Sequence, residues 1–92
     1  MRRFEIGSHP RTMAVFLLEH CHEPVDCPAA FAAWKGVESP LRGTTVLCSC
    51  PTGVHRLWFV VDAPDELAAL GHLPHYLAER AVATPVARVP IP

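Results

Sequence analysis

The sequence predicts a single α+β domain in which four strands and two helices follow the order β-α-β-β-α-β. Its 92 residues are enough for one hydrophobic core but not for two. Half of the residues are hydrophobic and 18% are charged, which is typical of a chain that folds around such a core. Apolar runs of strand length alternate with segments that begin at a proline or an acidic residue, as helices often do.

The first part of the chain predicts a strand followed by a helix. Residues 1–12 form a polar leader, and the near-continuous apolar run MAVFLLEH at 13–20 predicts the first strand. Pro28, directly after Cys27, predicts the start of a helix, because proline is favoured in a first helical turn. The helix should end near Gly36, since glycine is common just past a helix C-terminus.

The rest of the chain predicts a hairpin, a second helix and a last strand. TTVLCSC at 44–50 and HRLWFVVD at 55–62 are separated by a short turn, so they should pair as antiparallel strands. The segment from Pro64 predicts a helix, which Pro74 must kink or split. Residues 84–91 alternate in polarity and contain prolines, which suits an edge strand because proline has no N–H to donate.

This order of elements is that of the ferredoxin-like fold, a four-stranded antiparallel sheet with two helices on one face. We expect residues 13–92 to form it, with the first and third strands in the centre because they are the most apolar. The runs VFLL and LWFVV in these strands are apolar on both faces, so the face without helices would expose an apolar patch. We therefore expect a homodimer that buries this face.

The charge pattern argues against some partners. The formal net charge is −1 and Arg2–Arg3 is the only adjacent basic pair, so neither nucleic acid nor an anionic membrane surface is expected. No apolar run approaches the roughly 20 residues of a membrane-spanning helix, and the N-terminal residues lack the apolar stretch of a signal peptide. We expect a cytoplasmic protein from a bacterium, in which the four cysteines are free thiols or metal ligands.

The expected topology gathers cysteines and histidines at one end of the sheet. The first strand ends, the second strand ends and the third strand begins at the same edge. Six side chains there are candidate metal ligands: Cys48, Cys50 and His55 first, then His20, His22 and Cys27. Cys48 and Cys50 are two apart on a strand and should point to the same face. Thiolates together with imidazoles suit zinc, and also copper(I) or nickel.

Thiol chemistry is a second hypothesis for the same end of the molecule. Cys27 is predicted at a helix N-terminus, where the helix dipole lowers the pKa of a thiol. His20 or His22 could then act as its base or counter-charge, and Cys27 with His22 are the candidate catalytic residues of a thiol-dependent enzyme. Cys48 and Cys50 could in turn form or exchange a disulfide.

A third hypothesis is a pocket for a small organic molecule, with a histidine as the general base of a cofactor-free isomerase or monooxygenase. The side chains that could line it are His72, His75, Tyr76 and Trp58. The remaining alternative is a structural or partner-binding module without chemistry of its own, in which the cysteines are small buried side chains.

The chain from Met13 onward resembles small bacterial proteins of the dimeric α+β barrel superfamily. Its segment HRLWFVVDAPDELAAL, at 55–70, is similar to the strand and acidic helix start of a little-characterised group that includes a nickel-binding protein. The resemblance implies a homodimer packed through its sheet faces and favours metal binding. The superfamily also contains cofactor-free monooxygenases and isomerases, so the resemblance leaves the activity open.

Overall fold

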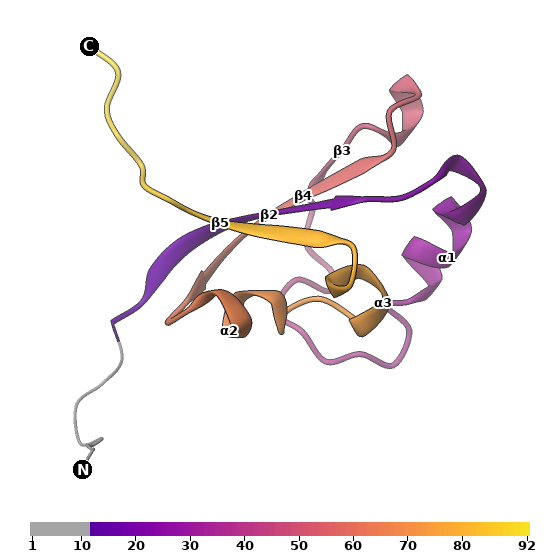
Figure 1. The fold of residues 1–92 in the computed structure, drawn as a ribbon, viewed down its shortest axis with the longest axis horizontal. Helices are drawn as coiled ribbons and strands as arrows, with labels where there is room; N and C mark the ends of the chain where they lie inside the picture. The colour runs from indigo at the N-terminus through magenta and orange to yellow at the C-terminus, as the bar shows by residue number, and fades with distance from the viewer. Residues whose placement is uncertain (1–11) are drawn as a thin grey trace.

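The computed structural model describes residues 12–92, so the predicted leader lies outside the described residues except for Thr12. The α+β class is confirmed (Figure 1). The strands are β2 (Ala14–Cys21), β3 (Leu47–Cys48), β4 (Arg56–Ala63) and β5 (Ala81–Val86). The helices are η1 (Pro24–Asp26), α1 (Cys27–Ala32), η2 (Cys50–Thr52), α2 (Glu66–Leu70) and α3 (His75–Ala78), η1 and η2 being 3-10 helices. Over this part of the chain, no helix has the length and apolar character needed to cross a membrane.

The four strands form one antiparallel sheet in the order β3-β4-β2-β5. The two central strands, β2 and β4, pair from Ala14 opposite Ala63 to Cys21 opposite Arg56. β5 pairs with the other side of β2, and β3 pairs with β4 over two residues only. Pro85 therefore lies in an edge strand, which is where a sheet tolerates a residue without an N–H.

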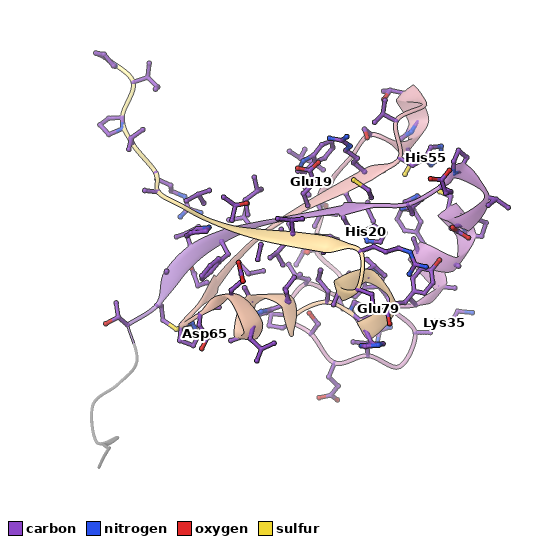
Figure 2. The ribbon with its side chains drawn as sticks, viewed as in Figure 1. Glu19, His20, Lys35, His55, Asp65 and Glu79 are labelled. Atoms are coloured by element: carbon purple, nitrogen blue, oxygen red, sulfur yellow. The ribbon has the colours of Figure 1, made fainter. Side chains whose placement is uncertain are left out.

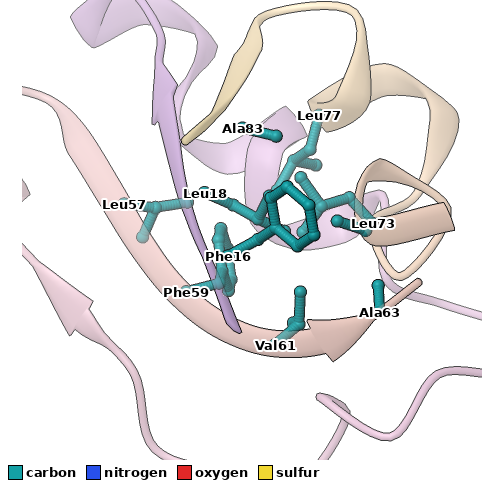
Figure 3. Close-up of a cluster of buried hydrophobic side chains, with 10 residues drawn as sticks. Phe16, Leu18, Leu57, Phe59, Val61, Ala63, Leu73, Leu77 and Ala83 are labelled. Atoms are coloured by element: carbon teal, nitrogen blue, oxygen red, sulfur yellow. The ribbon is translucent and has the colours of Figure 1, made fainter. Parts of the chain in front are cut away.

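One face of the sheet carries the hydrophobic core (Figure 3). Alternate side chains of β2 and β4 point to this face because successive residues of a strand point to opposite sides. They pack against Leu73 and Leu77 from the α2–α3 segment. Full burial of one large apolar side chain contributes about 1.5–3 kcal/mol, and the largest such residues of the two strands are Phe16, Leu18, Leu57 and Phe59.

The opposite face of the sheet is open. α2 and α3 lie together on the core side, as Figure 1 shows, and Trp34 packs there against Phe59 with ring centroids 5.9 Å apart. On the other side, apolar side chains of three strands remain exposed: Val60 is 52% exposed, Val82 67% and Leu47 74%. Among residues 12–92, helices thus cover the sheet on one side only.

Several elements differ from the sequence prediction in length. The second strand, predicted at 44–50, is only β3, because Thr44 is held in a turn by its N–H bond to the Leu41 carbonyl and the chain turns again at Ser49. The helix predicted from Pro28 begins one residue earlier, at Cys27, and is preceded by η1. The last strand, predicted at 84–91, lies at 81–86, since β2 offers no partner beyond Val15 opposite Val86.

The second helix is split, as Pro74 predicted. α2 begins where the Asp65 carboxylate accepts a hydrogen bond from the Ala68 N–H at 2.8 Å, which satisfies one of the unpaired donors of the first turn. It ends at Leu70, and Pro74 is the N-cap of α3 because proline has no N–H to continue the first helix. The break lets both short helices bury an apolar side chain, Ala69 and Leu77, against the sheet.

Candidate metal centre

Four side chains meet at the end of the sheet where β2 ends and β4 begins. They are His22, Cys27, Cys50 and His55, and one ligand atom from each lies within 4.8 Å of all the others. His22 is buried and the other three are half-buried. Figure 2 shows His55 at this end of the molecule, far from Asp65 at the other end. The arrangement offers two sulfur and two nitrogen donors around one point.

The backbone of two strand ends places the histidines. The His22 N–H donates to the His55 carbonyl at 3.1 Å, which continues the β2–β4 pairing one step beyond Cys21 opposite Arg56. His22 is two residues after His20 and four after Leu18, both fully buried on the core face. The candidate site is therefore the polar end of the core face.

Two tight turns of similar design bring in the cysteines. His22 and Cys27 flank η1, whereas Cys50 is the first residue of η2 and His55 follows that turn, so each 3-10 turn is associated with one histidine and one cysteine. Pro24 begins η1 and Pro51 lies in the first turn of η2, where their fixed φ suits a helical turn.

Gly53 ends the η2 turn in the left-handed region, at φ +96°, and sends the chain back toward β4. The ligand spacing is thus H-x4-C followed by C-x4-H. This mirrored spacing is a signal in the sequence for the four residues. The C-x-C and H-C-H runs in the same segments obscured that signal.

Cys48 lies beside the four-residue group and is not part of it. The predicted geometry, with Cys48 and Cys50 on one strand face, does not apply because the strand ends at Cys48 and Cys50 begins η2. Instead, the Cys50 N–H donates to the Cys48 sulfur at 3.3 Å. This contact makes Cys48 a neighbour of a candidate ligand.

The Cys50 thiol is the most perturbed group of the site. Burial, together with hydrogen bonds to the Cys48 and Cys27 thiols, raises the pKa of Cys50 to about 12. Without a cation the thiol therefore stays protonated at neutral pH, and it is a poor nucleophile because only the thiolate reacts. A bound metal ion would supply the positive charge that displaces this proton.

Three buried ring nitrogens have no hydrogen-bond partner among the described residues: Nε2 of His20, Nδ1 of His22 and Nδ1 of His55. Buried polar atoms are normally satisfied, and two of the three belong to the four-residue group. Burial lowers the pKa of His22, and the neighbouring His55 lowers it further. A neutral imidazole is the form that can give a lone pair to a metal.

The separation of two of these ligand atoms fits a tetrahedral ion. Nε2 of His22 and Sγ of Cys50 are 3.5 Å apart. A tetrahedral zinc with its usual bond lengths to nitrogen and sulfur separates two such ligand atoms by about 3.6 Å. This pair already has the required spacing, so a metal would need to draw in only the more distant members of the group.

His20 lies next to the site but makes a different contact. It is fully buried, its Nδ1 lies 3.1 Å from the Leu77 carbonyl oxygen, and its ring is 5.2 Å from that of His22. Burial lowers the pKa of His20, so the ring stays neutral. Of the six predicted ligands, the structure thus gathers His22, Cys27, Cys50 and His55, and it places Cys48 and His20 beside them.

The side chains proposed for an organic pocket do not meet in one cavity. His75 pairs with Glu79 at 2.9 Å on the surface, and His72 faces the carbonyls of its own helix segment. Tyr76 packs under the Arg80 guanidinium, and Trp58 lies on the open face of the sheet. These four residues therefore form no shared binding site.

The fourth cysteine, Cys21, is exposed.

Comparison with known proteins adds no assignment: no family model, no curated protein and no solved structure matches this chain. What the site does must therefore be argued from its own residues and their geometry.

Proposed function

We propose that the protein binds one zinc ion through His22, Cys27, Cys50 and His55. The observation that supports this is the convergence of two thiols and two imidazoles, from turns far apart in the sequence, within 4.8 Å. Two sulfur and two nitrogen donors around one point are the ligand set of tetrahedral structural zinc sites.

Zinc is favoured over the other two candidate metals by the donor set. Nickel(II) favours square-planar or tetragonal sites built from nitrogen and oxygen donors, whereas this set has two sulfurs and two nitrogens, which is typical of tetrahedral zinc. Copper(I) prefers sulfur donors, and half of this set is imidazole. Zinc accepts both kinds of donor and has no geometric preference that the site would have to overcome.

A site with four protein ligands has no open position, so its role would be structural and not catalytic. It would join the end of β2, the start of α1, the η2 turn and the start of β4. Within the described residues, the backbone hydrogen bonds that join these segments beyond the β2–β4 and β3–β4 pairings are His22 to His55 and Ser49 to Arg56. We infer that the metal fixes this end of the domain.

The first experiment is the elemental content of the protein, purified without an affinity tag, under reducing conditions and without chelator. We expect close to one zinc per chain by plasma mass spectrometry, and little nickel or copper. Cys50→Ser and Cys27→Ser should each lose most of the zinc, because serine is a poor zinc ligand.

Two cysteines that lie outside the ligand group serve as controls. Cys21→Ser changes an exposed thiol and should keep the full zinc content. Cys48→Ser should also keep it, because Cys48 contacts Cys50 without belonging to the group. A wild-type protein that contains no metal and takes up none on titration would contradict the proposal, and thiol reactivity at Cys27 would be measured next.

We also infer that the domain is ferredoxin-like and forms a homodimer through the open face of its sheet. The strand order, with the first and third strands central, supports the first inference. The exposed apolar side chains of β3, β4 and β5 support the second, since monomers seldom leave such a patch uncovered.

A further inference from the structure

His20 and His22 carry complementary buried atoms without partners. Nε2 of His20 and Nδ1 of His22 are both buried and make no hydrogen bond within residues 12–92. The two rings are neighbours on the core face, with centroids 5.2 Å apart and planes inclined by 38°. Because unpaired buried polar atoms cost free energy, a state in which each satisfies the other is favoured.

The hydrogen-bond partner of His20 defines which of its nitrogens carries the proton. Nδ1 lies 3.1 Å from the Leu77 carbonyl oxygen, and a carbonyl can only accept, so Nδ1 is the donor. The ring is fully buried, and a charged imidazole without a counter-charge is strongly disfavoured there. A neutral ring with its proton on Nδ1 leaves Nε2 as a hydrogen-bond acceptor.

Metal binding determines in the same way which ring nitrogen of His22 carries the proton. Its Nε2 faces the Cys50 sulfur at 3.5 Å and is the nitrogen that would bind the ion. A nitrogen that gives its lone pair to a metal carries no proton, so the proton of a neutral His22 is on Nδ1. His22 then has a buried donor, Nδ1–H, and the neighbouring His20 ring has a buried acceptor, Nε2, that lacks a donor.

We propose that His20 positions the ligand His22 through a chain of hydrogen bonds, from Nδ1–H of His22 to Nε2 of His20 and from Nδ1–H of His20 to the Leu77 carbonyl. This inference rests on the proposed zinc site. The chain of hydrogen bonds requires these two nitrogens of neighbouring rings to approach to about 3 Å, an ordinary hydrogen-bond length. Metal-binding histidines generally need such a partner for their second nitrogen.

This chain of hydrogen bonds links the candidate metal centre to the hydrophobic core. Leu77 belongs to α3 and is fully buried against the sheet, so the carbonyl that ends the chain is held by the packing of the fold. Within the described residues, His20 is the group that connects this packing to a ligand side chain. Its role would be to orient His22 and raise the basicity of the ligating nitrogen.

Nitrogen-15 NMR of the zinc-loaded wild-type protein tests the chain without any substitution. We expect His20 protonated on Nδ1 with an unprotonated Nε2, and His22 protonated on Nδ1 with Nε2 bound to zinc. A proton on Nε2 of His20, or zinc on Nδ1 of His22, would overturn the inference.

Two variants test the consequence for metal affinity. His20→Phe fills a similar space but cannot accept a hydrogen bond, and it should weaken zinc binding by about 10–100-fold, the usual effect of removing such a partner. His20→Gln keeps an acceptor and should restore most of the affinity. Equal zinc affinity of the wild type and His20→Phe would contradict the proposed hydrogen bonds of His20 while leaving the proposed zinc site intact. A wild-type protein without zinc affinity would contradict both proposals.

Discussion

His20, His22 and His55 form a row of rings at the end of the core face, with successive centroids 5.2 and 5.3 Å apart. The same residue type serves two purposes along this row. His22 and His55 belong to the group of side chains that could hold a metal ion, whereas His20 faces the core and a backbone carbonyl. Surroundings, and not residue type, decide which of these neighbouring histidines can be a ligand.

We predict that the metal-free protein loses stability as the pH is lowered below about 6.5. Burial lowers the pKa of both His20 and His22 from the ordinary value of 6.5, so below that value the unfolded chain binds protons that the folded chain does not. The free energy of unfolding therefore falls with falling pH until the folded-state pKa is passed. Urea unfolding in the presence of a chelator, at about pH 7.5 and about pH 5.5, measures the difference.

A surface histidine supplies the control for this measurement. The His75 side chain is 88% exposed, so burial does not act on it, and His75→Gln is the control for an effect that arises from buried rings. His20→Gln should reduce it. A metal-free protein whose stability is the same at both pH values, or is higher at the lower one, would show that these rings are not kept neutral by burial.

At the scale of elements, the candidate metal centre is made by turns and strand ends. Cys27 directly follows η1 and Cys50 begins η2, and short 3-10 turns have weak hydrogen bonds of their own. The core elements β2, β4, α2 and α3 are held by buried apolar side chains instead. The two parts of the molecule therefore depend on different interactions.

Metal removal should loosen the turns and leave the core elements in place. A zinc ion at a free concentration of 1,000 times its Kd stabilises the bound state by about 4 kcal/mol. Hydrogen exchange at amides that exchange only when the site opens should therefore slow about 1,000-fold when zinc binds. Hydrogen exchange with and without chelator should show this at the Ser49, Gly53 and Asp26 amides, each of which is bonded in or beside a turn.

The amides inside the β2–β4 pairing provide the comparison for this exchange experiment. Val61, opposite Phe16, lies in the buried centre of the sheet, so its exchange should change much less. A uniform change at Val61 and at the turns would mean that the metal stabilises the whole fold as one unit. No change at the turns would contradict the structural role that we propose for the ion.

At the scale of the whole molecule, the described part of the chain covers the sheet on one side only. Helices and the core lie on one face of the sheet, and the other face presents apolar side chains from β3, β4 and β5. The candidate metal centre lies at the end of the core face, so pairing of two copies through the open face would leave the centre unaltered. The two proposals can therefore be tested separately.

We predict a homodimer at micromolar concentration, to be measured by size-exclusion chromatography with light scattering. Val60→Asp places a charge in the middle of the open face, where the side chain is 52% exposed, and should give a folded monomer. Leu67→Asp changes a side chain that is 81% exposed on α2, on the helix side, and should leave the dimer intact. A monomeric wild-type protein would refute the prediction.

The pattern of apolar residues was sufficient to predict the class of fold and the two central strands. A buried strand needs alternate or continuous apolar residues, and 13–20 and 55–62 lie within one residue of β2 and β4. Pro74 likewise predicted a break, because a missing N–H is a local property that no tertiary contact can replace. The short β3 could not be predicted, since its length depends on where the chain turns at Ser49.

Local chemistry and strand topology also determined that cysteines and histidines would meet at one end. Only the tertiary structure decided which of them form the group. Cys48 and Cys50 look equivalent in the sequence, but the turn that begins at Cys50 brings that sulfur to Cys27 and His22 and leaves Cys48 beside it. Ligation requires several atoms within a few ångströms of one point, and such distances are set by turns and packing from distant parts of the chain.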